Sequence, residues 1–174
     1  FTSTQCQYNW VNNTPGIGLA TSGTGNVPSF TAINKGPTAI TATITATPEA
    51  VPLAYVASYT NGLVYVLNTA TNTVIKTIQA GTNPFSVAAS ADGTRVYVAN
   101  QGSGDISVIN TTNNVVIATI PAGPVPLTGM AMSPDGTRLY VVNQTARTVL
   151  VINTTASSIS ATIPVGAGRI SIQV

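Results

Sequence analysis

Histidine is absent from the 174-residue chain, cysteine occurs once, and there are only four carboxylates. Without histidine, Ser-His-Asp and Cys-His nucleophile systems and His-based metal sites are excluded. The acids Glu49, Asp92, Asp105 and Asp135 are widely separated, and nothing in their spacing suggests the convergent pair that a two-carboxylate hydrolase needs. We therefore predict that the chain is not an enzyme, has no catalytic residues and requires no cofactor or metal.

Charge is also scarce. Charged residues make up 6% of the chain, the net charge is +2, and the six Lys and Arg residues are scattered. Because nucleic-acid binding needs a clustered basic surface, we expect no nucleic-acid partner. No apolar run reaches the length of a membrane-spanning helix, so we expect no membrane insertion. Cys6 has no partner for an intrachain disulfide, which leaves an inert thiol or an intermolecular bridge.

The abundant residues are Thr, Asn, Ser, Ala, Val and Ile. The β-branched members of this set favour strands. Long stretches of Leu, Glu, Lys and Ala, which favour helices, are missing. An all-β fold is predicted.

An internal repeat organises most of the chain. Its copies read YVASYTNGLVYV at 55–66, YVANQGSGDISV at 97–108 and YVVNQTARTVLV at 140–151. Successive copies are 42 and 43 residues apart, and two markers keep this register: Tyr55, Tyr97 and Tyr140, and then Asn68, Asn110 and Asn153. A period near 42 residues with four short β segments per unit is typical of a propeller blade.

One full unit illustrates the expected blade. We predict strands at 86–90, 95–100, 105–110 and 115–120, with the Asp92-Gly93 turn after the first of them. The runs VYVAN and VVIATI are almost continuously apolar, which indicates strands covered on both faces. Small residues lie on the predicted inner strands, where blades crowd together: Ala88, Ala89, Gly129 and Ala131.

The stretch RVYVANQGSGDISVINTTNNVVIATIPAG at 95–123 follows SADGT at 90–94, and 133–155 repeats the pattern as SPDGTRLYVVNQTARTVLVINTT. These residues resemble the YVTN family of β-propeller repeats, which is found in bacterial and archaeal surface-layer and secreted proteins. The resemblance covers about residues 51–174. It implies about three four-stranded blades of an incomplete propeller, at about 53–93, 94–136 and 137–174, and a secreted or cell-surface location.

Residues 1–48 lie outside this register. Their sequence, with YNWVNNTP near the start and AITATITATP at the end, resembles the Ig-like, PKD-like modules of large secreted bacterial proteins. The resemblance implies a partial Ig-like β-sandwich segment with Trp10 as its core anchor. Apolar residues alternate with threonine from Ile40 to Thr47, which predicts a half-buried strand. Residues 49–52 are expected to be a linker before the propeller repeats at 53–174.

Three blades do not close a ring, because propellers have four to eight blades. The chain must be completed by the rest of a longer protein, by a second chain, or by polymerisation through exposed strand edges. A trailing strand is expected to provide one such edge, and its residues are the candidate assembly site: Arg169, Ile170, Ser171, Ile172, Gln173 and Val174.

Other polar residues have turn roles in this interpretation. Asp92 and Asp135 precede glycine at equivalent repeat positions and are predicted to be turn residues, and Asp105 is predicted to cap a loop. Arg95 and Arg138 form either hairpin-edge ion pairs or a ring of arginines that binds an anion. The candidate N-glycosylation acceptors are Asn12, Asn110, Asn143 and Asn153.

The favoured hypothesis is a non-enzymatic, extracellular structural or adhesive protein, a self-assembling filament or surface-layer subunit joined through strand edges as a homo-oligomer or polymer. The alternative is a binding module of a larger secreted protein, with a surface glycan or protein as its ligand. A lactonase-like propeller enzyme is the third hypothesis.

Overall fold

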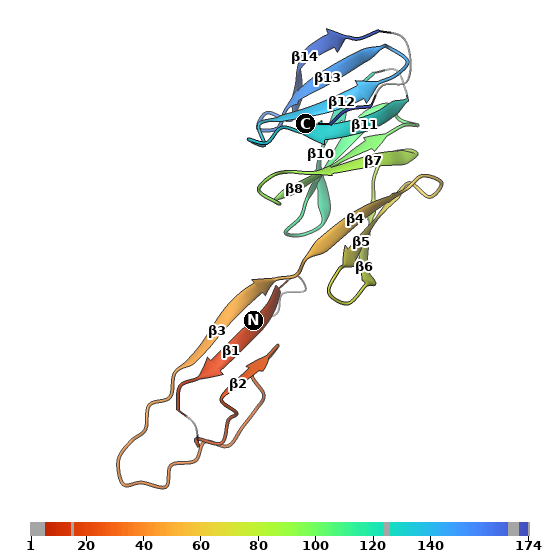
Figure 1. Ribbon diagram of the computed structural model, residues 1–174. Helices are drawn as coiled ribbons and strands as arrows, with labels where there is room; N and C mark the ends of the chain where they lie inside the picture. Colours follow the sequence, from red (N-terminus) through yellow and green to blue (C-terminus); the bar gives the residue numbers. More distant parts are fainter. Residues whose placement is uncertain (1–5, 15, 124–125, 167–170, 174) are drawn as a thin grey trace. The chain divides into compact units, whose positions relative to one another are not determined.

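The computed structural model describes residues 6–14, 16–123, 126–166 and 171–173. Two compact units divide the chain, Phe1–Pro52 and Leu53–Val174. Every regular element of the described residues is a β-strand (Figure 1), which confirms the all-β prediction.

The N-terminal unit is one antiparallel sheet in the order β2-β1-β3. Its strands are β1 (Cys6–Asn12), β2 (Ser22–Thr24) and β3 (Ile44–Ala50). Trp10 on the central strand is 3% exposed and packs with Ile17, Leu19 and Ala42, so its expected role as core anchor is confirmed. Gly23 lies directly against the indole, where an added Cβ would come within 2.7 Å of Trp10 Cε2.

The strand expected at 40–47 differs from the observed one. Ile40 and Ile44 are exposed, and strand β3 begins only at Ile44. The reason is the length of β1, whose last residue, Asn12, pairs with Ile44. Residues 40–43 lie beyond the end of that partner strand, so the alternating pattern has no ladder to join. At its other end β3 continues through Ala50, and only Val51 and Pro52 separate it from β4.

The second unit contains three antiparallel sheets, each a simple meander along the sequence. The first sheet consists of β4 (Leu53–Ser58), β5 (Leu63–Asn68) and β6 (Thr73–Gln79). The second sheet consists of β7 (Pro84–Ala89), β8 (Arg95–Asn100), β9 (Asp105–Asn110) and β10 (Val115–Pro121). The third sheet consists of β11 (Leu127–Met132), β12 (Arg138–Asn143), β13 (Thr148–Asn153) and β14 (Ser158–Pro164). The four strands predicted for the central unit are confirmed within two residues at each end.

The repeat tyrosines align the three sheets. Tyr55 lies on β4, Tyr97 on β8 and Tyr140 on β12, so these three strands are counterparts. The inner strands β7 and β11 lie side by side, and β4 contacts β7. Strands β7 and β11 pair with the inner edges of β8 and β12, but in the described residues no strand pairs with the corresponding inner edge of β4. A repeat unit counted from its tyrosine therefore contributes three strands to one sheet and the first strand to the next.

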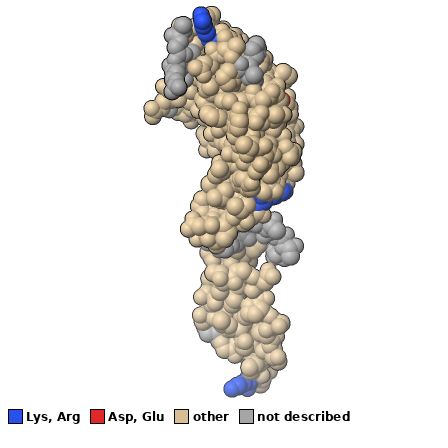
Figure 2. Space-filling view, turned by 90° about the vertical axis from the view of Figure 1, so that its right-hand side faces the viewer, with Lys and Arg blue, Asp and Glu red and all other residues tan. Residues whose placement is uncertain are grey.

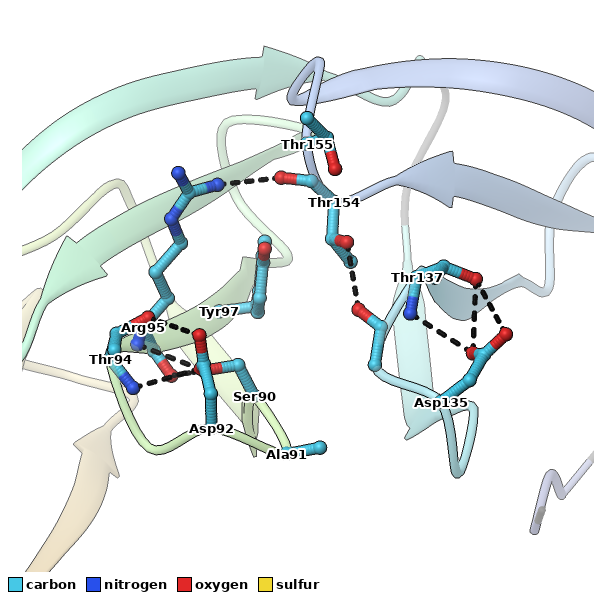
Figure 3. Close-up of a pocket in the computed structure, with 11 residues that line it drawn as sticks. Ser90, Ala91, Asp92, Thr94, Arg95, Tyr97, Asp135, Thr137, Thr154 and Thr155 are labelled. Atoms are coloured by element: carbon cyan, nitrogen blue, oxygen red, sulfur yellow. Dashed lines mark hydrogen bonds between the residues drawn. The ribbon is translucent and has the colours of Figure 1, made fainter.

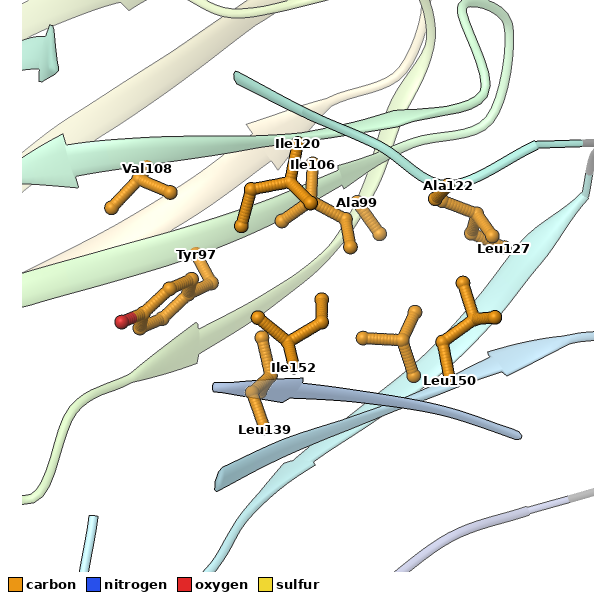
Figure 4. Packing of buried hydrophobic residues seen from close by; sticks show 11 residues of the cluster. Tyr97, Ala99, Ile106, Val108, Ile120, Ala122, Leu127, Leu139, Leu150 and Ile152 are labelled. Carbon is orange, nitrogen blue, oxygen red and sulfur yellow. The ribbon is translucent and has the colours of Figure 1, made fainter. Parts of the chain in front are cut away.

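Two apolar layers hold the sheets together. The first and second sheets enclose Val64, Val66, Val96, Val98 and Ile109. The second and third sheets enclose a larger cluster (Figure 4) that includes Tyr97, Ile106, Val108, Leu139 and Ile152. Strand β8, which contains the run VYVAN, is buried on both faces as predicted, and β9 is buried on both faces as well. The same prediction is wrong for the run VVIATI on β10, where exposed residues alternate with less exposed ones, because β10 is the outer edge of its sheet.

Candidate functional site at the faces between the sheets

The first two sheets are joined by a tyrosine–asparagine hydrogen bond. The Tyr55 hydroxyl on β4 donates to Asn114 Oδ1 at 2.6 Å. Asn114 lies in the turn between β9 and β10, with a φ of 54° and 3% of its surface exposed. Burial raises the pKa of Tyr55, so the hydroxyl stays protonated and acts as the donor. We call this pair the Tyr–Asn contact.

The same contact is incomplete between the second and third sheets. Tyr97 is the counterpart of Tyr55, is fully buried, and has no hydrogen-bond partner for its hydroxyl among the described residues. Ser157, at a φ of 50°, stands at the position that Asn114 holds one sheet earlier. Since serine is shorter than asparagine, its hydroxyl does not reach the tyrosine. This interface has another polar bond instead, from Arg95 Nη1 to the Thr154 carbonyl at 2.6 Å.

A cleft of about 340 Å³ opens beside Tyr97 (Figure 3). Three turns form it, and most of the residues that line it have polar side chains, although more of its exposed surface is apolar than polar. Its lining includes Ser90, Asp92, Asp135, Thr137 and Thr154. The cleft therefore lies where the second and third sheets meet, next to the hydroxyl that lacks a partner.

Two matching turns shape the rim of this cleft. Asp92 Oδ1 accepts hydrogen bonds from Ser90 Oγ at 2.6 Å and from the Thr94 amide at 3.0 Å. The bond from Ser90, followed by those from Thr94, lowers the Asp92 pKa to about 2. Asp135 has the same arrangement, and Ser133, followed by Thr137, lowers its pKa to about 2. These carboxylates are fixed as turn acceptors, which confirms their predicted role.

The two arginines do not form a common site in the described residues. Arg95 lines the cleft between the second and third sheets and bonds to a backbone carbonyl, whereas a hairpin-edge ion pair was expected. Arg138 lines a different hollow on the third sheet, and its charge helps to lower the pKa of Asp135. The two arginines follow equivalent hairpin turns, but Arg95 contacts the third sheet and Arg138 lines the open face of that sheet. The described residues therefore do not bring the two guanidinium groups together as an anion-binding ring requires.

That second hollow, of about 520 Å³, lies on the face of the third sheet that points away from the second sheet. Its lining includes Arg138, Tyr140, Val151 and Ile163. Ile163 is 46% exposed, whereas its counterpart Ile120 is 3% exposed under the third sheet. The face therefore has the composition of an internal sheet interface without a covering sheet.

The first sheet has the complementary open face. Val56 on β4 is 47% exposed, whereas its counterpart Val98 is fully buried between the first and second sheets. Asn72, in the turn between β5 and β6, is exposed, although its counterpart Asn114 is buried by Tyr55. The unit thus presents, at its two ends, the two halves of an interface that it already uses internally.

The expected trailing strand is only partly within the described residues. Arg169, Ile170 and Val174 lie outside them, and Ser171, Ile172 and Gln173 are not in a strand. Ile172 instead lies beside Gly129 on β11, where a Cβ added to the glycine would be 3.7 Å from Ile172 Cγ2. The strand prediction for 171–173 is therefore wrong for this structure.

The four candidate glycosylation acceptors differ in accessibility. Asn12 and Asn143 are buried, and their side-chain amides donate to backbone carbonyls of Leu19 and Ala122, respectively. Asn110 is partly buried and Asn153 is exposed. Both accept amide hydrogens through Oδ1 within their own turns. Their first role is thus to stabilise the turn after the third strand.

Asp105 has a structural role in the loop before β9. Asp105 accepts from Asn100 Nδ2 at 2.6 Å across the loop that joins β8 and β9, in agreement with its predicted capping role. Among the described residues there is no group of three or more metal-ligating side chains, and no helix long and apolar enough to cross a membrane. Figure 2 shows isolated Lys and Arg side chains on a surface made mainly of other residues.

No protein-family model and no curated protein matches the chain. Solved structures of the β-propeller type do match. Hydrazine synthase from Kuenenia stuttgartiensis superposes with a TM-score of 0.64 at 22% identity, over 68% of this chain and 34% of that one. The dihydro-heme d1 dehydrogenase NirN in complex with DHE gives a TM-score of 0.58 at 23% identity, over 66% and 24%. Apo AztD from Citrobacter koseri gives 0.59 at 15% identity, over 76% and 41%.

These likenesses establish the fold. The chain spans between about a quarter and two-fifths of the length of these three structures. It is therefore an incomplete propeller, as its three sheets indicate. Sequence reasoning missed the Tyr–Asn contact, although one signal was visible: Asn72 and Asn114 occupy the same place in successive repeats, and Ser157 breaks the series.

Proposed function

We propose that this chain is a non-enzymatic, extracellular structural subunit of a homo-oligomer, filament or surface layer. Its copies join through the open sheet faces and strand edges of the propeller unit. The sheets are YVTN-type repeats in this proposal, and the N-terminal sheet is a partial Ig-like module. One observation carries the proposal: the open faces at the two ends are counterparts of faces that are buried against each other inside the chain.

The energetics favour association through these faces. Apolar surface removed from water contributes about 25 cal/mol per Å². Val56 and Val74 on the first sheet and Ile163 on the third sheet are all exposed side chains that a neighbour would cover. The inner edge of β4, which pairs with no strand of the described residues, offers unpaired backbone groups, which are a template for strand addition from a second chain.

Electron microscopy of the purified protein, with the mass of the particles measured in parallel, tests the proposal. We expect filaments, sheets or closed rings built from subunits of 17.7 kDa. A matched variant, Val56→Asp, places a charge on the open face of the first sheet and is expected to abolish assembly while leaving the internal interfaces intact. A monodisperse wild-type monomer at high micromolar concentration would contradict the proposal.

A second function is favoured by the cleft beside Tyr97. The serine, threonine and aspartate side chains that line this cleft carry hydroxyls and carboxylates, which suit a polyhydroxylated ligand such as a surface glycan. A thermal-shift screen against neutral oligosaccharides distinguishes the two functions. Stabilisation that Thr137→Val removes would support a binding module, whereas a flat screen together with assembly would support the structural subunit.

A further inference from the structure

We propose that the Tyr140 hydroxyl of one copy donates a hydrogen bond to Asn72 Oδ1 of the next copy, as Tyr55 does to Asn114 within the chain. This inference rests on the assembly proposed above, here taken as head-to-tail: the open face of the third sheet of one copy packs on the open face of the first sheet of the next. It names the polar contact that fixes the register of the two copies. The occupant of the open face of the third sheet is, in this proposal, the first sheet of a second copy.

The acceptor is already in the right conformation. Asn72 has a φ of 55° and Asn114 has a φ of 54°, and both occupy the same place in the turn before the last strand of their sheets. A non-glycine residue rarely adopts this left-handed conformation, and asparagine is one of the residues that tolerate it. The Asn72 side chain is therefore expected to project from its turn as the Asn114 side chain does.

The donor is equally well matched. Tyr140 pairs with Val151, Tyr97 with Val108 and Tyr55 with Val66, so the tyrosine has the same register in all three sheets. Each tyrosine is directed to the face that looks toward the following sheet. Tyr55 reaches the second sheet, Tyr97 is buried under the third sheet, and Tyr140 lines the open hollow.

The surroundings of the two residues fit each other as well. Around Tyr140 the hollow contains Val151 and Ile163, and the open face of the first sheet carries Val56 and Val74. Among the described residues that line this hollow, Arg138 is the one with an ionised side chain. The guanidinium of its counterpart Arg95 donates a hydrogen bond to a turn carbonyl of the next sheet. An equivalent hydrogen bond to a turn carbonyl of a neighbouring copy would offset the cost of removing the Arg138 guanidinium from water.

A second copy is preferred over an unrelated partner because the complementary surface is present in the same molecule. Inside the chain, Tyr55 is covered by apolar residues and by an asparagine acceptor in the left-handed conformation. The same combination recurs on the exposed side of the first sheet. An unrelated partner would have to provide this combination independently. The repeat itself thus supplies the second half of the interface.

The test compares the critical concentration for assembly, measured by light scattering, in four proteins. These are the wild type, Tyr140→Phe, Asn72→Gly and the double variant. Glycine is chosen at residue 72 because it retains the positive φ. One hydrogen bond corresponds to a change of about 3- to 10-fold, so each single variant should raise the critical concentration by that factor. The double variant should be no worse than either single variant, because both remove the same bond.

Tyr59→Phe is the matched control, since it removes an exposed tyrosine hydroxyl from a loop and should leave the critical concentration unchanged. Thermal unfolding of Tyr140→Phe should match that of the wild type, which would show that the fold is retained. Assembly that is unaffected by the single variants, or effects that add in the double variant, would overturn the Tyr140–Asn72 pair while head-to-tail assembly stands. A wild type that stays monomeric would overturn both.

Discussion

Replacing Ser157 by asparagine should stabilise the propeller unit by completing the contact that Tyr97 lacks. The substitution acts in two ways. Asparagine tolerates the left-handed conformation at residue 157, where φ is 50°, better than serine does. Its side chain also supplies the acceptor that Asn114 supplies to Tyr55 at 2.6 Å.

The two effects can be separated in size. Relief of backbone strain should raise the free energy of unfolding by about 0.5 kcal/mol, which is less than the full cost of the left-handed conformation for an ordinary residue. The new hydrogen bond should add about 0.5–1.5 kcal/mol, because it satisfies a buried hydroxyl that now has no partner among the described residues. The free energy of unfolding should therefore rise by about 1–2 kcal/mol, which corresponds to roughly 4–8 °C in Tm for a unit of this size.

Urea denaturation followed by circular dichroism measures this change, and three companion variants isolate its origin. Ser157→Gly relieves the backbone without adding an acceptor, so it should give only the smaller gain. Tyr97→Phe should be close to neutral alone but should cost about 1 kcal/mol in the Ser157→Asn background. The reasoning is refuted if Ser157→Asn is no more stable than Ser157→Gly and the double-mutant cycle shows no coupling with Tyr97.

Three further predictions concern other positions. Arg147 has a φ of 55° where the two counterpart loops have glycine, so Arg147→Gly should stabilise by about 0.5–1 kcal/mol in thermal unfolding, and Arg147→Ala, which removes the charge but keeps a Cβ at the positive φ, should not. The pKa values of Asp92 and Asp135 are lowered to about 2, so their contribution to stability is present above pH 4 and is lost as the pH falls through 2. The Asp92→Asn/Asp135→Asn variant should therefore lose less stability between pH 5 and pH 2 than the wild type in acid titrations, and equal slopes would contradict this. Gly23→Ala should displace Trp10, the sole tryptophan, and shift its fluorescence to longer wavelength, whereas Gly36→Ala, where an added Cβ would lie 3.6 Å from Asn34 Oδ1, should leave the emission unchanged.

The strands of the second unit could be predicted because their signals are local and repeated. Tight turns such as Asp92-Gly93 separate short apolar runs, and each turn sets the pairing of the strands beside it. The period then transfers any assignment made in one unit to the others. The N-terminal unit has no internal repeat, so no second copy could correct an assignment made there. The alternation from Ile40 to Thr47 therefore could not reveal that its partner strand ends at Asn12.

The sequence pattern could not predict which residues form the contacts between sheets. Tyr55 and Asn114 lie 59 residues apart, and they belong to different repeat units. The period shows that both residues recur, but only the packing of one sheet on the next shows that they meet. The same holds for Arg95, whose partner is a backbone carbonyl and therefore leaves no trace in residue type.

The asymmetry between Ser157 and Asn72 has a physical explanation if copies assemble head to tail. Sheets within one chain are held at high effective concentration by their connection, so an internal interface tolerates the loss of one hydrogen bond. An interface between copies must also offset the loss of translational and rotational freedom, so each polar contact there has a larger effect on assembly.

Two matched substitutions test this distinction. Asn114→Gly removes the acceptor of the internal Tyr–Asn contact and should lower the free energy of unfolding by about 1–2 kcal/mol with little effect on the critical concentration. Asn72→Gly removes the external counterpart and should raise the critical concentration with little effect on unfolding of the monomer. If both substitutions change only monomer stability, Asn72 has no role between copies, and the open face of the first sheet is covered by something other than the third sheet of a neighbour.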